Sequence, residues 1–138
     1  GKGGIGKSMI SSHISFALAN MGLRVLHLGC DPKHDSTRLL LRGQMPRAIL
    51  DILRETDFRT NTMSLDDFVY ESPLSASVSG VLYGAESGGP EAGSGCAGKG
   101  VTEAIRTLSA LKVHDKLQLD AVLYDVLGDV VCGGFAMP

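Results

Sequence analysis

The amino-acid sequence predicts an α/β domain in which helices flank a mainly parallel sheet. Three short apolar runs, at residues 24–31, 78–86 and 120–126, have the length and character of buried strands. Stretches with helical periodicity lie between and around these runs. Since strands that alternate with helices build parallel sheets, the order of the segments indicates one α/β domain.

Four helices are expected from the pattern of apolar residues, caps and stops. The first covers residues 9–21, and Gly22 follows as its stop. Pro46 opens a second helix, and the Ser-x-x-Asp spacing at 64–67 resembles the cap of a third. The fourth begins near Val101. The helical spacing of the first is carried by Ile10, Ile14, Ala17, Leu18 and Met21.

The composition is that of a globular protein of about one domain. The 138 residues are 43% hydrophobic and 20% charged, with a formal net charge of -2, which argues against nucleic-acid binding because such proteins carry a basic footprint. No apolar run approaches the roughly 20 residues of a membrane span. No signal peptide precedes the first motif, so the cytoplasm is the expected location.

The chain opens with GKGGIGKS, which matches the phosphate-binding pattern G-x-x-x-x-G-K-[ST]. The glycines allow backbone N–H groups to converge on phosphates, Lys7 reaches the outer phosphates, and the Ser8 hydroxyl binds Mg²⁺. The pattern therefore predicts a nucleotide-binding loop. Its residues are Gly1, Lys2, Gly3, Gly4, Ile5, Gly6, Lys7 and Ser8.

Two aspartates, Asp31 and Asp125, end predicted strands. In an open parallel sheet the ligand crevice lies outside the carboxyl ends of the strands, so both carboxylates are expected at the nucleotide. Asp125 and Gly128 also have the D-x-x-G spacing of a loop that senses a γ-phosphate. The alternative for either aspartate alone is an ordinary strand-end or turn residue.

A phosphate loop joins the end of a strand to a helix, and here no strand precedes the loop. The chain also stops at Pro138, after a glycine-rich turn and without a closing element. We therefore expect residues 1–138 to form a single partial domain of a longer protein. The first strand and the C-terminal half are expected to lie outside this sequence.

Three cysteines are an odd count, which argues against disulfides and favours metal or redox chemistry. Cys96 lies in the glycine-rich stretch 87–100 and Cys132 in a second one, and neither belongs to a C-x-x-C pair. Two thiolates from one chain are half of the four that a cubane iron–sulfur cluster needs, and a two-fold dimer supplies the others. Composition alone favours buried structural cysteines, so both interpretations stay open at this level.

The phosphate loop has one lysine more than its pattern requires. With Lys2 it resembles the deviant loops of a class of dimeric P-loop NTPases, in which the early lysine reaches the nucleotide of the other subunit. A second cation there suits the charge that develops during phosphoryl transfer. The alternative is a solvated loop lysine. The resemblance implies a dimer.

Four segments together resemble the nitrogenase iron protein (dinitrogenase reductase) family. In chain order they are GKGGIGKS, GCDPKHDSTRLLL, ESGGPEAGSGCAGKGV and YDVLGDVVCGGFAMP. The resemblance runs almost from end to end and weakens only across about 43–85. It implies a P-loop NTPase of the deviant-loop dimeric class that carries a 4Fe-4S cluster and binds MgATP.

The resemblance implies a role for each matching residue. Cys96 and Cys132 become the cluster ligands of this subunit, with one cluster shared across the dimer. Cys30 is not a cluster ligand in the family, and a packed strand-end thiol is expected there. The nucleotide and Mg²⁺ residues include Lys2, Lys7, Ser8, Asp31, Asp35, Asp125, Gly128 and Asp129, of which Lys2, Asp31 and Asp125 are catalytic.

The implied activity is that of an ATP-dependent electron donor in nitrogen fixation. A homodimer takes one electron from ferredoxin or flavodoxin and passes it, with MgATP hydrolysis, to a dinitrogenase of the molybdenum–iron type or an analogous partner. Seven residues lead from Asp125 to Cys132, so one short segment links the phosphate sensor to a cluster ligand.

Three residues, Met9, His34 and Lys99, depart from the family pattern. Lys99 stands where the family usually has an arginine beside the cluster, and lysine keeps the charge but loses the planar fork. We therefore expect no arginine-type ADP-ribosylation at this site.

Two alternatives stay open. The departures suit a nitrogenase-like reductase that serves another partner, in tetrapyrrole or carbon–sulfur reduction. A cluster-free partitioning or metal-carrier ATPase of the same class would explain Lys2 and Lys7, but would not require cysteines in glycine-rich settings.

Overall fold

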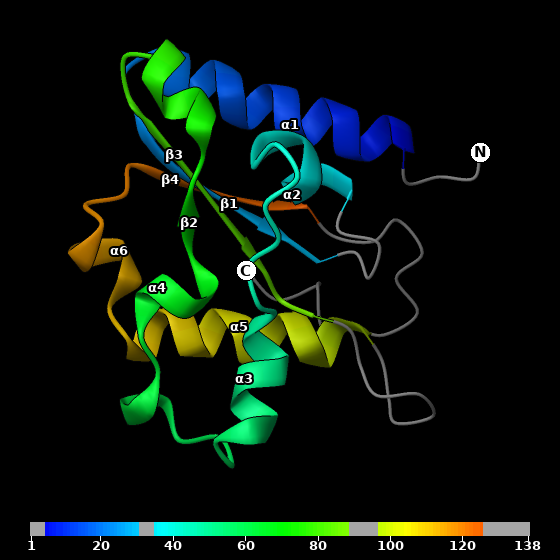
Figure 1. The fold of residues 1–138 in the computed structure, drawn as a ribbon, viewed down its shortest axis with the longest axis vertical. Helices are drawn as coiled ribbons and strands as arrows, with labels where there is room; N and C mark the ends of the chain where they lie inside the picture. Colours follow the sequence, from blue (N-terminus) through cyan, green and yellow to red (C-terminus); the bar gives the residue numbers. More distant parts are fainter. Residues whose placement is uncertain (1–4, 31–34, 89–96, 126–138) are drawn as a thin grey trace.

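Three layers make up the fold, with one sheet between two groups of helices (Figure 1). The computed structural model describes residues 5–30, 35–88 and 97–125. Its strands are β1 (Arg24–Gly29), β2 (Tyr70–Glu71), β3 (Val81–Glu86) and β4 (Ala121–Asp125), in the sheet order β2-β3-β1-β4. β1 pairs in parallel with β3 and β4, and the short β2 pairs antiparallel with β3. The predicted α/β architecture with a mainly parallel sheet is confirmed.

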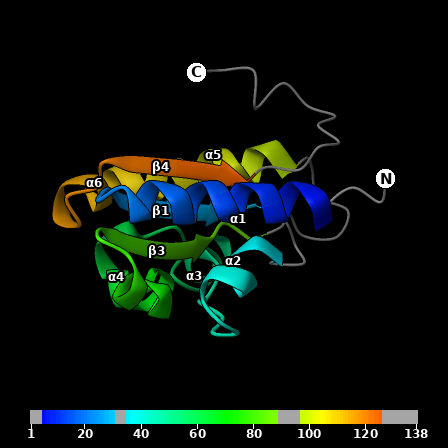
Figure 2. The same ribbon diagram turned by 90° about the horizontal axis from the view of Figure 1, so that it is seen from above.

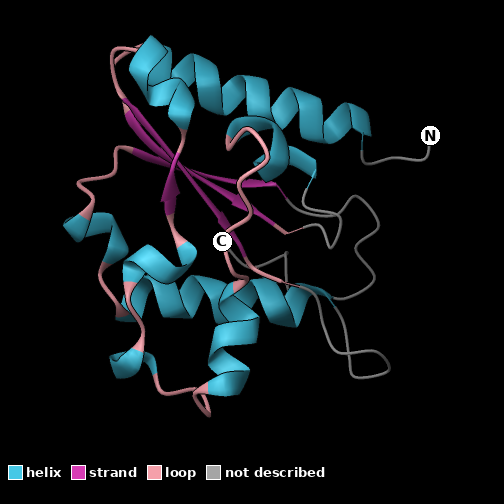
Figure 3. Ribbon diagram, viewed as in Figure 1, coloured by secondary structure: helices cyan, strands magenta, loops and turns pink. Residues whose placement is uncertain are grey.

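Helices cover both faces of the sheet (Figure 2, Figure 3). On one face lie α1 (Ile5–Asn20) and α2 (Asp35–Leu40), and on the other lie α3 (Ile49–Glu55) and α5 (Ala97–Ala110). In Figure 2, α1 runs over β1, with β3 and β4 on either side. The shorter elements are η1 (Thr60–Thr62), α4 (Leu65–Phe68), η2 (Pro73–Ser77) and α6 (Val113–Lys116). Among the described residues, no helix is both long and apolar enough to span a bilayer.

Two apolar clusters fill the spaces on either side of the sheet. The larger one packs Leu26 and Leu28 of β1 against the helices α3 and α5. The smaller one lies under α1 and α2 and contains Val25 of β1. Because side chains alternate along a strand, the odd-numbered residues of β1 face α1 and the even-numbered ones face α5.

The helix α1 buries small polar side chains and exposes apolar ones. Ser12 and Ser15 are 2% and 0% exposed, whereas Ile10 and Met21 are 64% and 74% exposed. The helix predicted from the apolar spacing is therefore confirmed, but most of its predicted apolar stripe is exposed, and within that stripe Leu18 packs against the smaller cluster. Serine side chains are small enough to let the helix lie close to the sheet, and each buried hydroxyl has a hydrogen-bond partner there or in the helix itself.

Some boundaries and one cap differ from the prediction. The strand expected over 78–86 begins only at Val81, because the N–H of Gly80 donates to the Ala19 carbonyl oxygen at 2.8 Å and ties this segment to the end of α1. The helix α5 begins at residue 97, inside the expected glycine-rich loop. Ser64 occupies the N-cap position of α4, but its side chain makes no capping hydrogen bond.

Candidate functional site: the carboxyl edge of the sheet

The strands β3, β1 and β4 end side by side, at what we call the carboxyl edge of the sheet. Gly29 of β1 pairs in register with both Glu86 of β3 and Asp125 of β4. In Figure 1 these strands run towards the right-hand side, where α1 and α5 begin. Because ligands of open parallel sheets bind at this edge, the fold brings the predicted nucleotide elements to the place where a ligand is expected.

Asp125 is the last residue of β4 and is 2% exposed. Its carbonyl oxygen accepts a 3.0 Å hydrogen bond from the N–H of Cys30, which ties the end of β4 to the end of β1. Residues in register on parallel strands point to the same face, so the register with Gly29 turns the Asp125 side chain towards α1. The predicted strand end at this edge is confirmed.

Glu86 is a buried carboxylate that the sequence analysis did not single out. It ends β3 and is 1% exposed. A Cβ on Gly29 would lie only 2.5 Å from the Glu86 Oε1 atom and 2.9 Å from Oε2, so the carboxylate lies directly over Gly29. The available signal was a glutamate at the end of an apolar run, beside a second run that ends in glycine.

A buried hydrogen bond holds α1 on the sheet behind these carboxylates. The Ser15 hydroxyl and the His27 Nδ1 atom are 2.8 Å apart, and both residues are 0% exposed. His27 lies two residues before Gly29 on the same face of β1. The sequence analysis missed this pair, although a histidine inside the apolar run 24–31 marked the position.

The phosphate loop leads into the first turn of α1, which begins at Ile5. Gly6 and Lys7 belong to this first turn, so their backbone N–H groups are among those that no helix carbonyl satisfies, and Ser8 follows directly. A Cβ on Gly6 would meet nothing within 4 Å, and Gly6 is exposed. The start of α1 therefore suits an anionic ligand. The loop residues Gly1, Lys2, Gly3 and Gly4 lie outside the described residues.

Of the other predicted site residues, one lies in the described part of the chain and five lie outside it. Asp35 is the first residue of α2. The remaining ones, Asp31, Cys96, Gly128, Asp129 and Cys132, lie outside the described residues. In the sequence, β3 is followed by the segment with Cys96 and β4 by the segment with Cys132, and these two strands are separated in the sheet by β1 alone, about 10 Å.

Cys30 is a packed thiol, as expected. It is 4% exposed and belongs to the larger apolar cluster, on the face of the sheet opposite α1. Its Sγ atom lies 3.9 Å from the carbonyl oxygen of Leu28. Within the described ranges there is no group of three or more histidine, cysteine or acidic side chains that could hold a metal ion.

The described residues on either side of the segment that carries Cys96 contact one residue, Leu50 of α3. The N–H of Leu50 donates to the Ser87 carbonyl oxygen at 3.0 Å. A Cβ on Gly88 would lie 3.3 Å from the Leu50 Cβ atom, and a Cβ on Gly100 would lie 2.8 Å from its Cδ1 atom. Glycine at both positions lets the chain pack this closely on α3.

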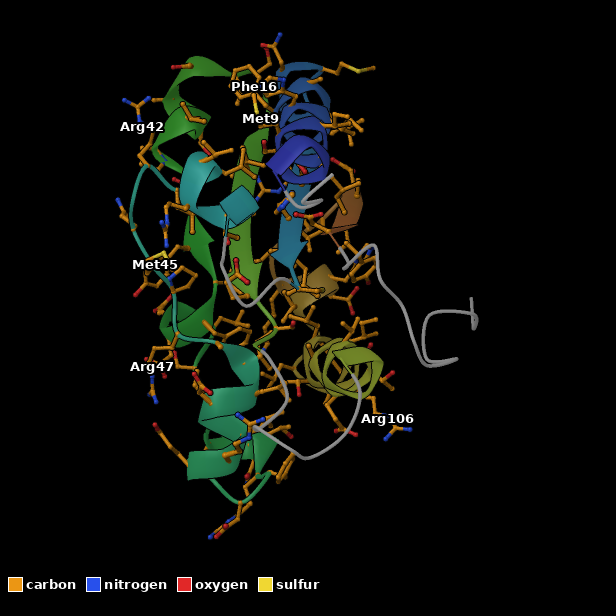
Figure 4. The ribbon with its side chains drawn as sticks, turned by 90° about the vertical axis from the view of Figure 1, so that its right-hand side faces the viewer. Met9, Phe16, Arg42, Met45, Arg47 and Arg106 are labelled. Carbon is orange, nitrogen blue, oxygen red and sulfur yellow. The ribbon has the colours of Figure 1, made fainter. Side chains whose placement is uncertain are left out.

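An open polar hollow of about 500 Å³ lies beside the start of α3. Arg47 pairs there with Glu55, and the hydrogen bond to this carboxylate raises the pKa of Arg47. In Figure 4 the labelled side chains of Arg42, Met45 and Arg47 point away from the protein body. Because ion pairs exposed to this degree contribute little and nothing here converges on a ligand, the hollow is not the candidate site.

Comparison with known proteins identifies the family of the chain. The whole chain, residues 1–138, matches the family model described as 4Fe-4S iron sulfur cluster binding proteins, NifH/frxC family. A nitrogenase iron protein of Methanococcus voltae is 52% identical over 138 residues, which are 100% of this chain and 46% of the relative. A light-independent protochlorophyllide reductase iron-sulfur ATP-binding protein of Synechococcus sp. (strain RCC307) is 51% identical over 139 residues, 100% of this chain and 43% of that protein. The chain thus spans less than half the length of these relatives, and the resemblance drawn from the four segments is confirmed.

Proposed function

The chain belongs to the NifH/frxC family of 4Fe-4S cluster binding proteins, and from this membership we propose that it forms the nucleotide- and cluster-binding part of an ATP-dependent reductase. The cofactors of the family are a 4Fe-4S cluster and MgATP. The whole protein is a cytoplasmic homodimer in this proposal. It passes single electrons from ferredoxin or flavodoxin to a dinitrogenase partner.

One observation carries the proposal. The end of β1 lies between the ends of β3 and β4, the strands that precede the two cysteines in the sequence, and beneath the start of the phosphate-loop helix. Glu86 precedes Cys96 by ten residues and Asp125 precedes Cys132 by seven. Both strand ends are tied to β1, by the bonds from Ser87 N–H to the Gly29 oxygen at 2.9 Å and from Cys30 N–H to the Asp125 oxygen at 3.0 Å. A nucleotide at this edge therefore lies within a few residues of both cluster-bearing segments.

At the nucleotide, the backbone of the first turn of α1 binds the phosphates, Lys7 neutralises their charge and Ser8 holds Mg²⁺. Lys2 reaches the nucleotide of the partner subunit. Asp125, held at the end of β4, would orient the attacking water or a Mg²⁺ ligand, and Asp31, two residues after β1 in the sequence, would share this role. The remaining switch residues are Asp35, Gly128 and Asp129.

When bound, the cluster supplies one-electron redox chemistry and MgATP supplies the free energy that makes electron transfer directional. Cys96 and Cys132 hold one half of the cluster and the same residues of the second subunit hold the other. Because Cys132 follows Asp125 by only seven residues in the sequence, a movement of the phosphate sensor would be passed to this ligand.

The test uses the whole protein, purified without oxygen and reduced with dithionite. We expect four iron atoms per dimer and an EPR signal of the reduced cluster whose shape changes when MgATP is added. A dimer without iron and acid-labile sulfide would refute the redox function and support a cluster-free partitioning or metal-carrier ATPase. An EPR signal whose shape does not change when MgATP is added would refute only the coupling between the nucleotide and the cluster.

A second candidate partner follows from the near-equal identity to two kinds of relative. A reductase of this family with a tetrapyrrole-reducing partner would use the same cluster and nucleotide residues. Mixing the reduced protein and MgATP with each catalytic component separately distinguishes the two. Electron transfer to a dinitrogenase, and none to the tetrapyrrole-reducing component, is the expected result, and the reverse would change the substrate but keep the mechanism.

A further inference from the structure

The buried carboxylate of Glu86 has no role in the function described above. We propose that Glu86 is a positioning residue that transmits the state of the nucleotide site to the segment that carries Cys96, an inference that rests on the proposed function. This second route runs through β3. It is separate from the step that links Asp125 to Cys132 through the segment after β4.

The first argument is where Glu86 lies relative to α1. Ser15 of α1 meets His27 of β1, and Gly29, under the Glu86 carboxylate, is two residues or about 6.6 Å further towards the carboxyl edge. The connection from α1 to β1 is short, so the helix runs back along the strand from that edge. The same 6.6 Å corresponds to about four helix residues and leads to Ser11, one turn from Lys7 and Ser8. Glu86 therefore lies beneath the first turns of the phosphate-loop helix.

The second argument is electrostatic. Glu86 and Asp125 are both buried, and the register turns them to the same face of the sheet. Since the Glu86 carboxylate reaches over Gly29, it is about one strand spacing, roughly 4.8 Å, from the strand that carries Asp125. Two buried carboxylates on neighbouring strands and on the same face interact with each other and with any cation that enters. Binding or loss of Mg²⁺ and phosphate at this edge therefore changes the force on Glu86.

The third argument is the mechanical connection from Glu86 to the Cys96 segment. Ser87, the next residue, donates its N–H to Gly29 and accepts the N–H of Leu50. Gly88 and Gly100, at the two ends of the segment, both pack on Leu50. Ser87 thus joins Glu86 to both β1 and α3, at the point where the chain leaves β3. A displacement of Glu86 acts directly on this junction, from which Cys96 is nine residues further along the sequence.

The experiment uses the whole iron-loaded protein in three forms: wild type, Glu86→Gln and the control Glu71→Gln. Glu71 lies on β2 of the same sheet but is exposed, so the same loss of charge there leaves the carboxyl edge intact. The rate at which an iron chelator removes the cluster is measured with and without MgATP, together with the affinity for MgATP and the iron content. We expect Glu86→Gln to keep its iron and to bind MgATP within about threefold of wild type, while the effect of MgATP on the chelation rate falls at least fivefold.

A second variant moves the carboxylate instead of neutralising it. Gly29→Ala places a methyl group where the Glu86 carboxylate lies, so the charge is kept but displaced. The effect of MgATP on the chelation rate is expected to fall as it does in Glu86→Gln. If Glu86→Gln does not assemble its cluster, Gly29→Ala alone tests the role of Glu86. A full MgATP effect in either assembled variant overturns the role of Glu86. A wild type without iron or without any MgATP effect overturns the proposed function as well, so the two failures are distinguishable.

Discussion

Removal of the Ser15 hydroxyl tests how the phosphate-loop helix is held on the sheet. Ser15 and His27 are both 0% exposed and share a 2.8 Å hydrogen bond. Ser15→Ala removes one partner and leaves the His27 Nδ1 atom to face a methyl group. A buried polar atom that loses its partner costs about 1–3 kcal/mol, so we expect the free energy of unfolding to fall by this amount.

Ser12→Ala is the matched control for this change. Ser12 lies on the same buried side of α1, 2% exposed, but its hydroxyl donates to the Met9 carbonyl oxygen of its own helix at 3.0 Å. That carbonyl already serves the helix, and alanine has the higher helix propensity, so the expected loss is about 0.5 kcal/mol or less.

Urea unfolding of the whole protein without nucleotide measures both losses. In a double-mutant cycle with His27→Leu, the coupling between Ser15 and His27 should exceed about 0.5 kcal/mol. Equal losses for the two serine variants, or a coupling of zero, would show that the bond does not hold α1 and would refute this account.

Three further outcomes are expected. Gly88→Ala should destabilise the protein by about 1–3 kcal/mol in the same assay, because Gly88 has a φ of +89° and its Cβ would lie 3.0 Å from that of Ala48. Partial burial, and then the nearby Cys30 charge, raise the pKa of Tyr124 in the folded protein, so the tyrosine ionises at a lower pH in the unfolded chain. The contribution of Tyr124 to stability should therefore be complete below about pH 10 and fall above it. The melting temperature should fall less with rising pH in Tyr124→Phe than in the wild type. An arginine-specific ADP-ribosyltransferase should leave residue 99 of the wild type unlabelled and label residue 99 of Lys99→Arg, as mass spectrometry of the peptide would detect.

The sequence was sufficient to predict the three longer strands and the edge where they meet. Runs of apolar residues are a property of the chain itself, and the rule that ligands bind at the carboxyl ends of parallel strands then assigns Asp125 to the site. The short elements α2, β2 and α6 were not predicted. Segments of two to six residues contain too few positions for a period to emerge, and the pairing of β2 with β3 depends on tertiary contact.

The orientation of α1 could not be predicted from its period. Periodicity shows that the apolar residues share one side of the helix, but it does not say whether that side meets the sheet. Here the sheet offers His27 and two carboxylates beneath α1, and these polar groups require small polar neighbours. Ser12 and Ser15 meet this requirement, and Ile10 and Met21 are left outside.

The pairing of Gly29 with Glu86 at the carboxyl edge could not be predicted from the sequence either. Neither residue is informative alone, because a strand-end glycine is common and a strand-end glutamate is normally solvated. Only the register of β1 with β3 reveals that Glu86 occupies the space that a side chain at residue 29 would need. The Glu86 carboxylate can remain buried under α1 because Gly29 has no side chain.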